Sequence, residues 1–278
     1  GGEGHVLVES GVMRFEQRIL LVEDMTANQE IARAMLESFG STVDLAKNGA
    51  VALEKYQQET YDIILMDCQM PVMDGFEATR HIRQLESQQP GNLRMPIVAL
   101  TAGKTETEKE RCYASGMDKI LFKPYSTVDL NNVMFQYFEP KGEVAAPKNI
   151  EILPDEGGGE ILDMKALENI RSVDASGTND LLIKVLEHFR LDVQVKLDEL
   201  RENHDNPEFL GAGAHAIKSM SLNIGAKALS AYCRQREMDW KNQLVSDSRR
   251  EIEVMHGHYL DALRALDQLV EPSADLID

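Results

Sequence analysis

Four apolar segments of this chain end in side chains that could bind or carry a phosphoryl group. These are the acidic pair Glu23-Asp24, the carboxylate of Asp67, the hydroxyl of Thr101 and the ammonium of Lys123. In open α/β sheets, ligands bind beyond the carboxyl ends of the strands, where such side chains can meet. Asp67 closes an apolar run that begins at Tyr61, and a loop follows at once. The combination suggests an aspartate that accepts a phosphoryl group.

The composition favours a globular protein with two domains. The chain has 278 residues, of which 43% are hydrophobic, and this is enough for ordinary cores. Its formal charge of −18 argues against nucleic-acid and anionic-membrane partners, because both need a basic surface. No apolar run approaches the roughly 20 residues that span a bilayer. The amino terminus lacks the basic and apolar regions of a signal peptide. We therefore expect no direct membrane contact within this chain.

The cysteines Cys68, Cys112 and Cys233 lie far apart in the sequence and lack metal-ligand spacing. They argue against a disulfide framework and favour a reducing cytoplasm as the compartment. No histidine lies near Cys68 in the sequence to activate its thiol. We therefore interpret Cys68 as a small packing residue.

Strand and helix patterns alternate over residues 18–138. Strands are predicted at 18–23, 42–46, 61–67, 96–101 and 118–123, and helices at about 26–39, 48–59, 74–86, 104–115 and 126–138. Strands alternating with helices of this length indicate βαβ units and a parallel sheet. Right-handed crossovers then place helices on both faces. We expect a flavodoxin-like, five-stranded, parallel, doubly wound α/β domain, preceded by an extension at 1–17.

A linker and an all-α domain are predicted after the α/β domain. Residues 139–160 contain three prolines and a glycine triplet, which indicate a flexible linker. From residue 161 the strand signal disappears, and amphipathic helical patterns follow one another with short turns between them. We expect an antiparallel four-helix bundle at 161–271 and a carboxyl-terminal tail at 272–278.

His215 lies in a helix predicted at 208–224. On a helical wheel it falls roughly 140° from Leu210, which belongs to the core-facing stripe. We therefore expect the imidazole to project toward solvent, with Lys218 one turn away on the surface. Small neighbours such as Ser219 would leave the ring accessible to a partner protein, and Lys218 could neutralise a phosphoryl group on it. The alternative is a plain solvated histidine.

These motifs resemble two domains of two-component signalling. Residues 18–138 resemble a response-regulator receiver domain through the acidic pair, the segment D-x-x-M-P-x-M-D-G, the strand-end threonine and Lys123-Pro124. Residues 161–271 resemble a histidine-phosphotransfer (HPt) domain through the pattern H-x-x-K-x-x-S-x-x-x-G-A, which begins at His215. Together they are similar to the carboxyl-terminal part of a hybrid sensor histidine kinase. Such a part lies in the cytoplasm, and its parent protein can be anchored in the inner membrane.

The resemblance implies a magnesium-dependent phosphoacceptor in the first domain. Asp67 would accept the phosphoryl group. Asp24 and Asp67 would bind Mg²⁺ directly, Glu23 would act through water, and Gln69 would contribute its backbone carbonyl. Mg²⁺ is a hard ion that uses one or two carboxylates together with waters and phosphate, which agrees with this ligand set.

The resemblance also implies a second station in the helical domain. Lys123, joined to Pro124 by a cis peptide, and Thr101 would hold the phosphoryl oxygens on the first domain. His215 would then take the phosphoryl group and pass it on, or run the step in reverse, with Lys218 stabilising the transferred group. The implied partners are an upstream histidine kinase core, in the parent chain or separate, and a downstream response-regulator receiver. Signature elements of a kinase catalytic core are not found within this chain.

Two positions depart from the family patterns. Ile120 stands three positions before Lys123, where many receivers have an aromatic residue that couples phosphorylation to a surface change. Ser219 stands where HPt domains often have glycine, next to Lys218.

Two other functions remain as alternatives. The first is a regulatory binding module of a hybrid kinase that transfers little phosphate. The second is an aspartate-nucleophile phosphatase of the haloacid type. That chemistry needs an acid two residues after the nucleophile, and Gln69 occupies the position.

Overall fold

A computed structural model describes residues 12–88, 91, 93–144 and 161–270. Its first half, here called the α/β half, contains a five-stranded parallel sheet with the order β2-β1-β3-β4-β5. The strands are β1 (Arg18–Val22), β2 (Thr42–Ala46), β3 (Ile63–Asp67), β4 (Ile97–Thr101) and β5 (Lys119–Phe122). Every residue of β3 and β4 is buried, because helices cover both faces of the sheet. The predicted flavodoxin-like architecture is confirmed.

The helices of the α/β half divide between the two faces of the sheet. They are α1 (Thr26–Ser38), α2 (Gly49–Gln58), α3 (Gly75–Ser87), α4 (Glu106–Ser115) and α5 (Thr127–Tyr137). The buried side chains of α1 and α5 pack in one hydrophobic cluster, and those of α2, α3 and α4 pack in the other. Alternate residues of β1 supply both clusters, with Leu21 on the α1 side and Leu20 on the α2 side. The predicted element bounds agree with the structure to within about two residues.

The loop after β3 is held close to the strand end by Gly75. A Cβ atom at this position would lie 2.1 Å from the carbonyl oxygen of Asp67. Only glycine permits so close an approach of the two backbones. The side chain of Asp74 accepts a hydrogen bond from the backbone of Glu77 and caps α3. The loop that follows Asp67 is therefore fixed at both ends.

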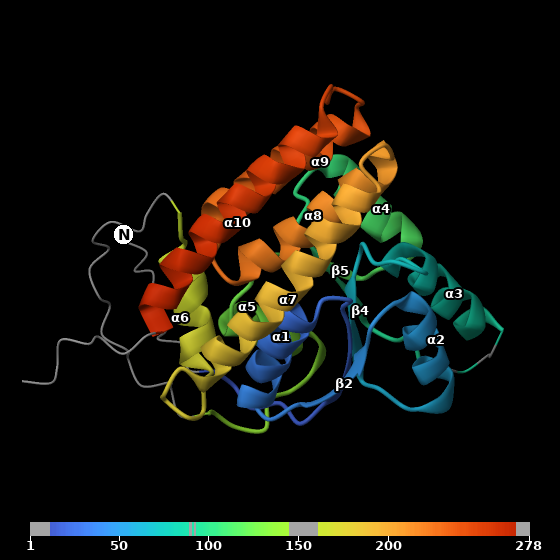
Figure 1. The fold of residues 1–278 in the computed structure, drawn as a ribbon. Helices are drawn as coiled ribbons and strands as arrows, with labels where there is room; N and C mark the ends of the chain where they lie inside the picture. The colour runs from blue at the N-terminus through green and yellow to red at the C-terminus, as the bar shows by residue number, and fades with distance from the viewer. Residues whose placement is uncertain (1–11, 89–90, 92, 145–160, 271–278) are drawn as a thin grey trace, which may run out of the picture.

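The second half, here called the helical half, contains long helices joined by short turns. They are α6 (Met164–Ser172), α7 (Asp180–Glu202), α8 (Pro207–Asn223), α9 (Lys227–Lys241) and α10 (Ser248–Val270). Pro207 is the first residue of α8, and Asn206 caps it. Gly225 ends α8 with φ of 78°, a conformation that glycine adopts without strain. The predicted helical bundle is confirmed, with the short α6 packed beside the longer helices (Figure 1).

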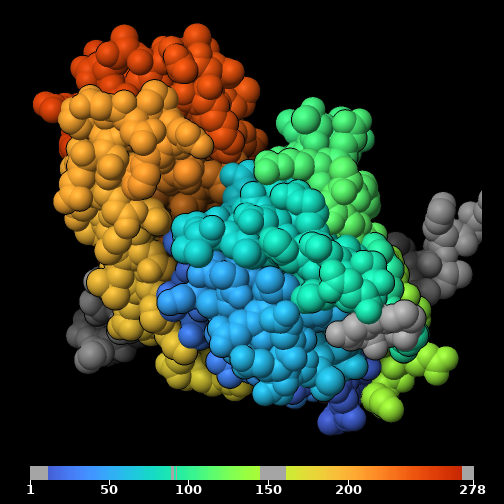
Figure 2. Space-filling view, turned by 90° about the vertical axis from the view of Figure 1, so that its right-hand side faces the viewer, coloured from blue at the N-terminus to red at the C-terminus, as the bar shows by residue number. Residues whose placement is uncertain are grey.

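The two halves pack directly on each other. Helices α7 and α8 lie along α1 (Figure 1), and the yellow and orange helices contact the blue and cyan half in the space-filling view (Figure 2). One hydrophobic cluster joins Ile31 and Met35 of α1 with Val185 and Phe189 of α7. The face of the sheet that α1 and α5 cover is therefore continuous with the core of the helical half.

Parts of the predicted extension and linker belong to the α/β half. Phe15 is fully buried and packs edge to face on Phe39, with ring centroids 6.2 Å apart. The backbone of 12–14 pairs with 142–144, for example through Arg14 N donating to the Gly142 oxygen at 2.7 Å. These contacts extend past the boundaries predicted at residues 17 and 139, because no apolar run or helical period in the sequence marks such short pairings. Residues 1–11, 145–160 and 271–278 lie outside the described residues. Within the described ranges, none of the helices combines the length and the apolar character needed to cross a membrane.

Candidate functional site

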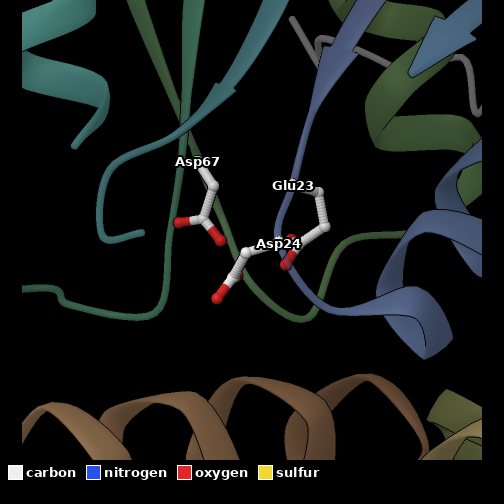
Figure 3. A group of neighbouring side chains, drawn as sticks. All are labelled: Glu23, Asp24 and Asp67. Atoms are coloured by element: carbon white, nitrogen blue, oxygen red, sulfur yellow. The ribbon is translucent and has the colours of Figure 1, made fainter. Parts of the chain in front are cut away.

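Three carboxylates meet at the carboxyl edge of the sheet. Glu23 and Asp24 follow β1, and Asp67 ends β3 (Figure 3). One potential ligand atom from each lies within 4.8 Å of the others, which is close enough for a single metal ion. The sequence predicted this grouping from strand ends alone, and the parallel topology brings it about.

Lys123 places its ammonium among these carboxylates. Its Nζ lies 2.7 Å from Asp67 Oδ2 and 2.8 Å from Glu23 Oε2. The side chain is buried, and burial alone would lower its pKa, but the charges of Asp67 and Glu23 outweigh burial and raise the pKa well above its ordinary value. Lys123 is joined to Pro124 by a cis peptide bond, as predicted. The ammonium therefore stays charged and fixes the two carboxylates it contacts.

Glu23, Asp24 and Asp67, here called the acidic group, carry more negative charge than the Lys123 ammonium compensates. Burial is the largest cause that raises the pKa of Asp67 to about 7. Burial, then the charges of Glu23 and Asp67, raise the pKa of Asp24 to about 9. Glu23 behaves differently, because the Lys123 contact overcomes its burial and lowers its pKa. One ammonium thus compensates part of the negative charge, and a cation at Asp24 and Asp67 would be attracted.

Thr101 and Gln69 lie next to the acidic group with different orientations. The backbone N–H of Gln69 donates to Asp67 Oδ1 at 3.2 Å. The Thr101 hydroxyl donates to Glu108 Oε1 of α4 at 2.8 Å and accepts from Gly103 N at 3.1 Å. The structure thus places Thr101 at the neighbouring strand end, as predicted. Its hydroxyl proton is donated to Glu108 of α4.

His215 is buried, and the prediction that it projects toward solvent was wrong. The residue is 6% exposed, and Lys218 and Ser219 are buried as well. The helical wheel identified the face of α8 that points to the core of the bundle. The opposite face is covered too, because the α/β half packs on it. The small residues of α8 therefore permit close packing within the chain.

Glu237 of α9 binds His215 and was missed by the sequence analysis. Its Oε1 accepts from His215 Nδ1 at 3.0 Å, and its Oε2 accepts from Lys218 Nζ at 2.5 Å. Lys241 Nζ also donates to Glu237 Oε1, at 2.6 Å. A signal was present, because Glu237 falls on the buried stripe of α9 with Leu229, Cys233 and Trp240. A carboxylate in an apolar stripe needs a charged or hydrogen-bonding partner.

His215, Lys218 and Glu237 form a second polar cluster. The pKa values of His215 and Glu237 are both shifted within it. Burial lowers the pKa of His215, the charges of Lys218 and Lys123 act in the same direction, and Glu237 opposes them. The pKa of Glu237 is lowered, because its hydrogen bond to His215 and the neighbouring charges outweigh its burial. A carboxylate that accepts the Nδ1 proton of a neutral imidazole leaves the lone pair of Nε2 available.

One cavity connects the two clusters. It has a volume of about 540 Å³ and is lined from the α/β half by Asp24, Gln69 and Pro71, and from the helical half by His215, Ala216 and Lys241. In Figure 3 the helix that crosses below the acidic group has the orange shade of α8. His215 and Asp24, one of the three carboxylates that could hold a metal ion, thus line the same cavity from the two halves.

Known proteins are similar to this chain in the α/β half and beyond it. Residues 19–135 match the family model of the response regulator receiver domain. Sensor histidine kinase GacS of Pseudomonas protegens is 31% identical over 223 residues, which cover 79% of this chain and 24% of that protein. Signal transduction histidine-protein kinase BarA of Escherichia coli K12 is 29% identical over 266 residues, 93% of this chain and 27% of that protein. The chain therefore spans about a quarter of the length of these two relatives.

A solved structure is also similar to the α/β half. It is the receiver domain of sensor histidine kinase PA1611 of Pseudomonas aeruginosa, crystallised with a magnesium ion in its active-site cleft. It is 41% identical, covers 44% of this chain and 98% of that chain, and has a TM-score of 0.40.

Proposed function

Because residues 19–135 form a response-regulator receiver domain homologous to those of hybrid histidine kinases, we propose that this chain is a two-station phosphorelay module. Asp67 accepts a phosphoryl group from a phosphohistidine, and His215 carries it onward to a downstream response regulator, or back. The observation that carries the proposal is the shared cavity, which His215 lines together with Asp24 and Gln69 of the receiver.

Mg²⁺ is the cofactor that the acidic group fits. Asp24 and Asp67 would hold it directly with the Gln69 carbonyl. Glu23, whose Oε2 lies 2.8 Å from Lys123 Nζ, would contact the ion through water. The raised pKa of Asp24 indicates a site that gains from a cation. Bound Mg²⁺ would neutralise charge that develops on the transferring phosphoryl group.

His215 is arranged as the second acceptor. In the transfer step, the Nε2 lone pair attacks phosphorus, the bond between phosphorus and the Asp67 oxygen breaks, and the Asp67 carboxylate is regenerated. The ring gains positive charge as the nitrogen–phosphorus bond forms, and the Glu237 carboxylate on Nδ1, 3.0 Å away, offsets that charge. Lys218, held by the same carboxylate, is the nearby cation for the phosphoryl oxygens.

Labelling with a small phosphodonor such as acetyl phosphate and Mg²⁺ tests this function. We expect base-labile phosphate on Asp67 and acid-labile, base-stable phosphate on His215, mapped by mass spectrometry. Asp67→Asn should remove both labels, and His215→Gln should retain the Asp67 label alone. Undiminished labelling of Asp67→Asn would refute the assignment of Asp67. Phosphate that stays on Asp67 of the wild-type chain would instead favour the regulatory binding module.

Asp24→Asn should stabilise the protein without Mg²⁺ and remove its response to the ion. The Asp24 pKa is raised from 3.8 to about 9, so the folded state loses stability as the pH rises through this range, when the unfolded carboxyl is already ionised. We expect Asp24→Asn to raise the melting temperature by about 3–6 °C at pH 8, and by less at pH 5.

Mg²⁺ should raise the melting temperature of the wild type, because it binds the folded state. It should leave the melting temperature of Asp24→Asn almost unchanged. Thermal unfolding with Mg²⁺ or with a chelator measures both effects. The exposed Glu54→Gln makes the same charge change on α2 and serves as the control. A magnesium-induced shift of wild-type size in Asp24→Asn would rule out Asp24 as a ligand.

A further inference from the structure

A polar bridge crosses the interface between the two halves next to the phosphoacceptor. Asn28 of α1 is 1% exposed. Its amide nitrogen donates to Glu23 Oε1 at 3.2 Å and to Ser219 Oγ of α8 at 3.1 Å. Its amide oxygen accepts from Asn223 Nδ2, also of α8, at 2.9 Å. Both amide protons and the carbonyl of Asn28 are thus engaged, and two of these bonds reach the helical half.

Ser219 also reaches into the receiver site itself. Lys123 Nζ donates to Ser219 Oγ at 3.0 Å, in addition to its bonds to Asp67 and Glu23. The three donors of the ammonium are therefore filled, one of them by the other half of the chain. A glycine at this position, as the HPt pattern often has, could not make this bond.

Apolar and charged contacts extend the interface beyond the bridge. The cluster that includes Ile31 of α1 and Phe189 of α7 makes a shared core. Lys184 of α7 lies 2.7 Å from Glu30 of α1, at the partly exposed rim. The receiver site thus faces α8 as part of a packed interface with buried polar contacts.

We infer that the phosphoryl group passes between Asp67 and His215 of the same chain, and that Ser219 and Asn28 are positioning residues for this transfer. The inference rests on the proposed function and adds the partner, which is the chain's own helical half. Ser219 accepts from Lys123 while Asp67 is unmodified. Its hydroxyl can donate to a phosphoryl oxygen once Asp67 is phosphorylated. Transfer breaks the phosphorus–oxygen bond at Asp67 and forms the phosphorus–nitrogen bond at His215, with no further reactant.

Mixing two single variants separates transfer within a chain from transfer between chains. Asp67→Asn retains His215, and His215→Gln retains Asp67. In an equimolar mixture at about 1 µM, far below the millimolar effective concentration of a tethered domain, we expect His215 labelling below about one-tenth of the wild-type rate. The wild-type rate should not change with chain concentration. Wild-type-like labelling of the mixture, or a wild-type rate proportional to concentration, would overturn the inference.

Failure of the proposed function gives a different result, because the wild-type chain itself would then carry no phosphate on His215. Gel filtration of each phosphorylated chain shows whether the labelled species is a monomer or a dimer. A stable dimer with efficient labelling of the mixture would count against transfer within one chain.

Charge reversal at the rim tests the docked arrangement without changing either site. Lys184→Glu should slow transfer to His215 about two- to fivefold, with Asp67 labelling unchanged, and Glu30→Lys in the same chain should restore the rate. Ser219→Ala should slow the same step about tenfold, because the phosphoryl group on Asp67 loses the hydroxyl donor from α8. Its melting temperature should stay within a few degrees of wild type. A wild-type rate of transfer to His215 in Lys184→Glu, or in Ser219→Ala, would contradict the positioning role.

Discussion

Replacing Lys123 with alanine is expected to lower the free energy of unfolding by about 3–5 kcal/mol at pH 8 and to abolish phosphorylation of Asp67. The ammonium is buried and contacts Asp67 and Glu23 at 2.7 and 2.8 Å. Removing it leaves buried carboxylates without their counter-ion, which costs more than the pair contributes when intact. It also removes the cation that holds phosphoryl oxygens in the proposed reaction.

The destabilisation caused by Lys123→Ala should depend on pH. The pKa of Asp67 is already raised to about 7 and that of Asp24 to about 9, and loss of the ammonium raises the pKa of Asp67 further. Carboxyls with raised folded-state pKa values lose stability as the pH rises through those values. The deficit should therefore be largest near pH 8 and shrink toward pH 5, where the carboxyls bind protons.

Urea unfolding at the two pH values measures the deficit of Lys123→Ala. Lys119→Ala, at the first residue of the strand that precedes Lys123, removes an ammonium that contacts Gln136 and serves as the matched control. A deficit below about 1 kcal/mol, or one that is equal at pH 5 and pH 8, would show that Lys123 does not compensate the acidic group.

The central strands β3 and β4 were predictable because they are buried on both faces. Such strands appear in a sequence as continuous apolar runs, and β3 and β4 have this character up to their last residues, Asp67 and Thr101. The acidic group was predictable for a related reason. Asp67 ends one strand and Glu23 and Asp24 follow another, and parallel topology brings strand ends to one edge of the sheet. The direction of the Thr101 hydroxyl was not predictable, because its rotamer depends on neighbours such as Glu108, which lies seven residues away.

The burial of His215 was beyond the reach of a single-helix argument. A helical wheel identifies an apolar stripe and assigns the opposite face to solvent, but it takes no account of another domain that packs on the helix. Here the α/β half covers the face that carries His215, through polar contacts such as Asn28 with Ser219. Polar interface residues look like surface residues in a sequence. The same limit hid the role of Glu237, whose partner His215 is 22 residues distant and on another helix.

Glu237→Gln is expected to slow phosphoryl transfer to His215 about 100-fold while Asp67 labelling stays close to wild type. The carboxylate accepts from His215 Nδ1 at 3.0 Å and so fixes the ring with Nε2 available. An amide can present its NH₂ group to Nδ1 instead, which would favour the tautomer with the proton on Nε2 and block the nucleophile. The amide also lacks the charge that offsets the ring as it is phosphorylated.

The same substitution should cost about 3 kcal/mol of unfolding free energy, and this deficit should fade at a lower pH than the deficit of Lys123→Ala. The pKa of Glu237 is lowered, so its contribution is present above its unfolded value of 4.5 and is lost as the pH falls through the folded value. The deficit of Glu237→Gln should therefore persist from pH 8 to pH 5 and fade at lower pH.

Single-turnover transfer from Asp67 to His215, measured beside urea unfolding, separates the two effects of Glu237→Gln. Glu253→Gln, which changes an exposed carboxylate of α10 paired with Arg201, should alter neither rate nor stability by much. If Glu237 only held the bundle together, conditions that restore the fold of Glu237→Gln, such as a stabilising osmolyte, would restore the rate as well. Because the carboxylate acts on the ring itself, we expect the slow transfer to remain when folding is complete.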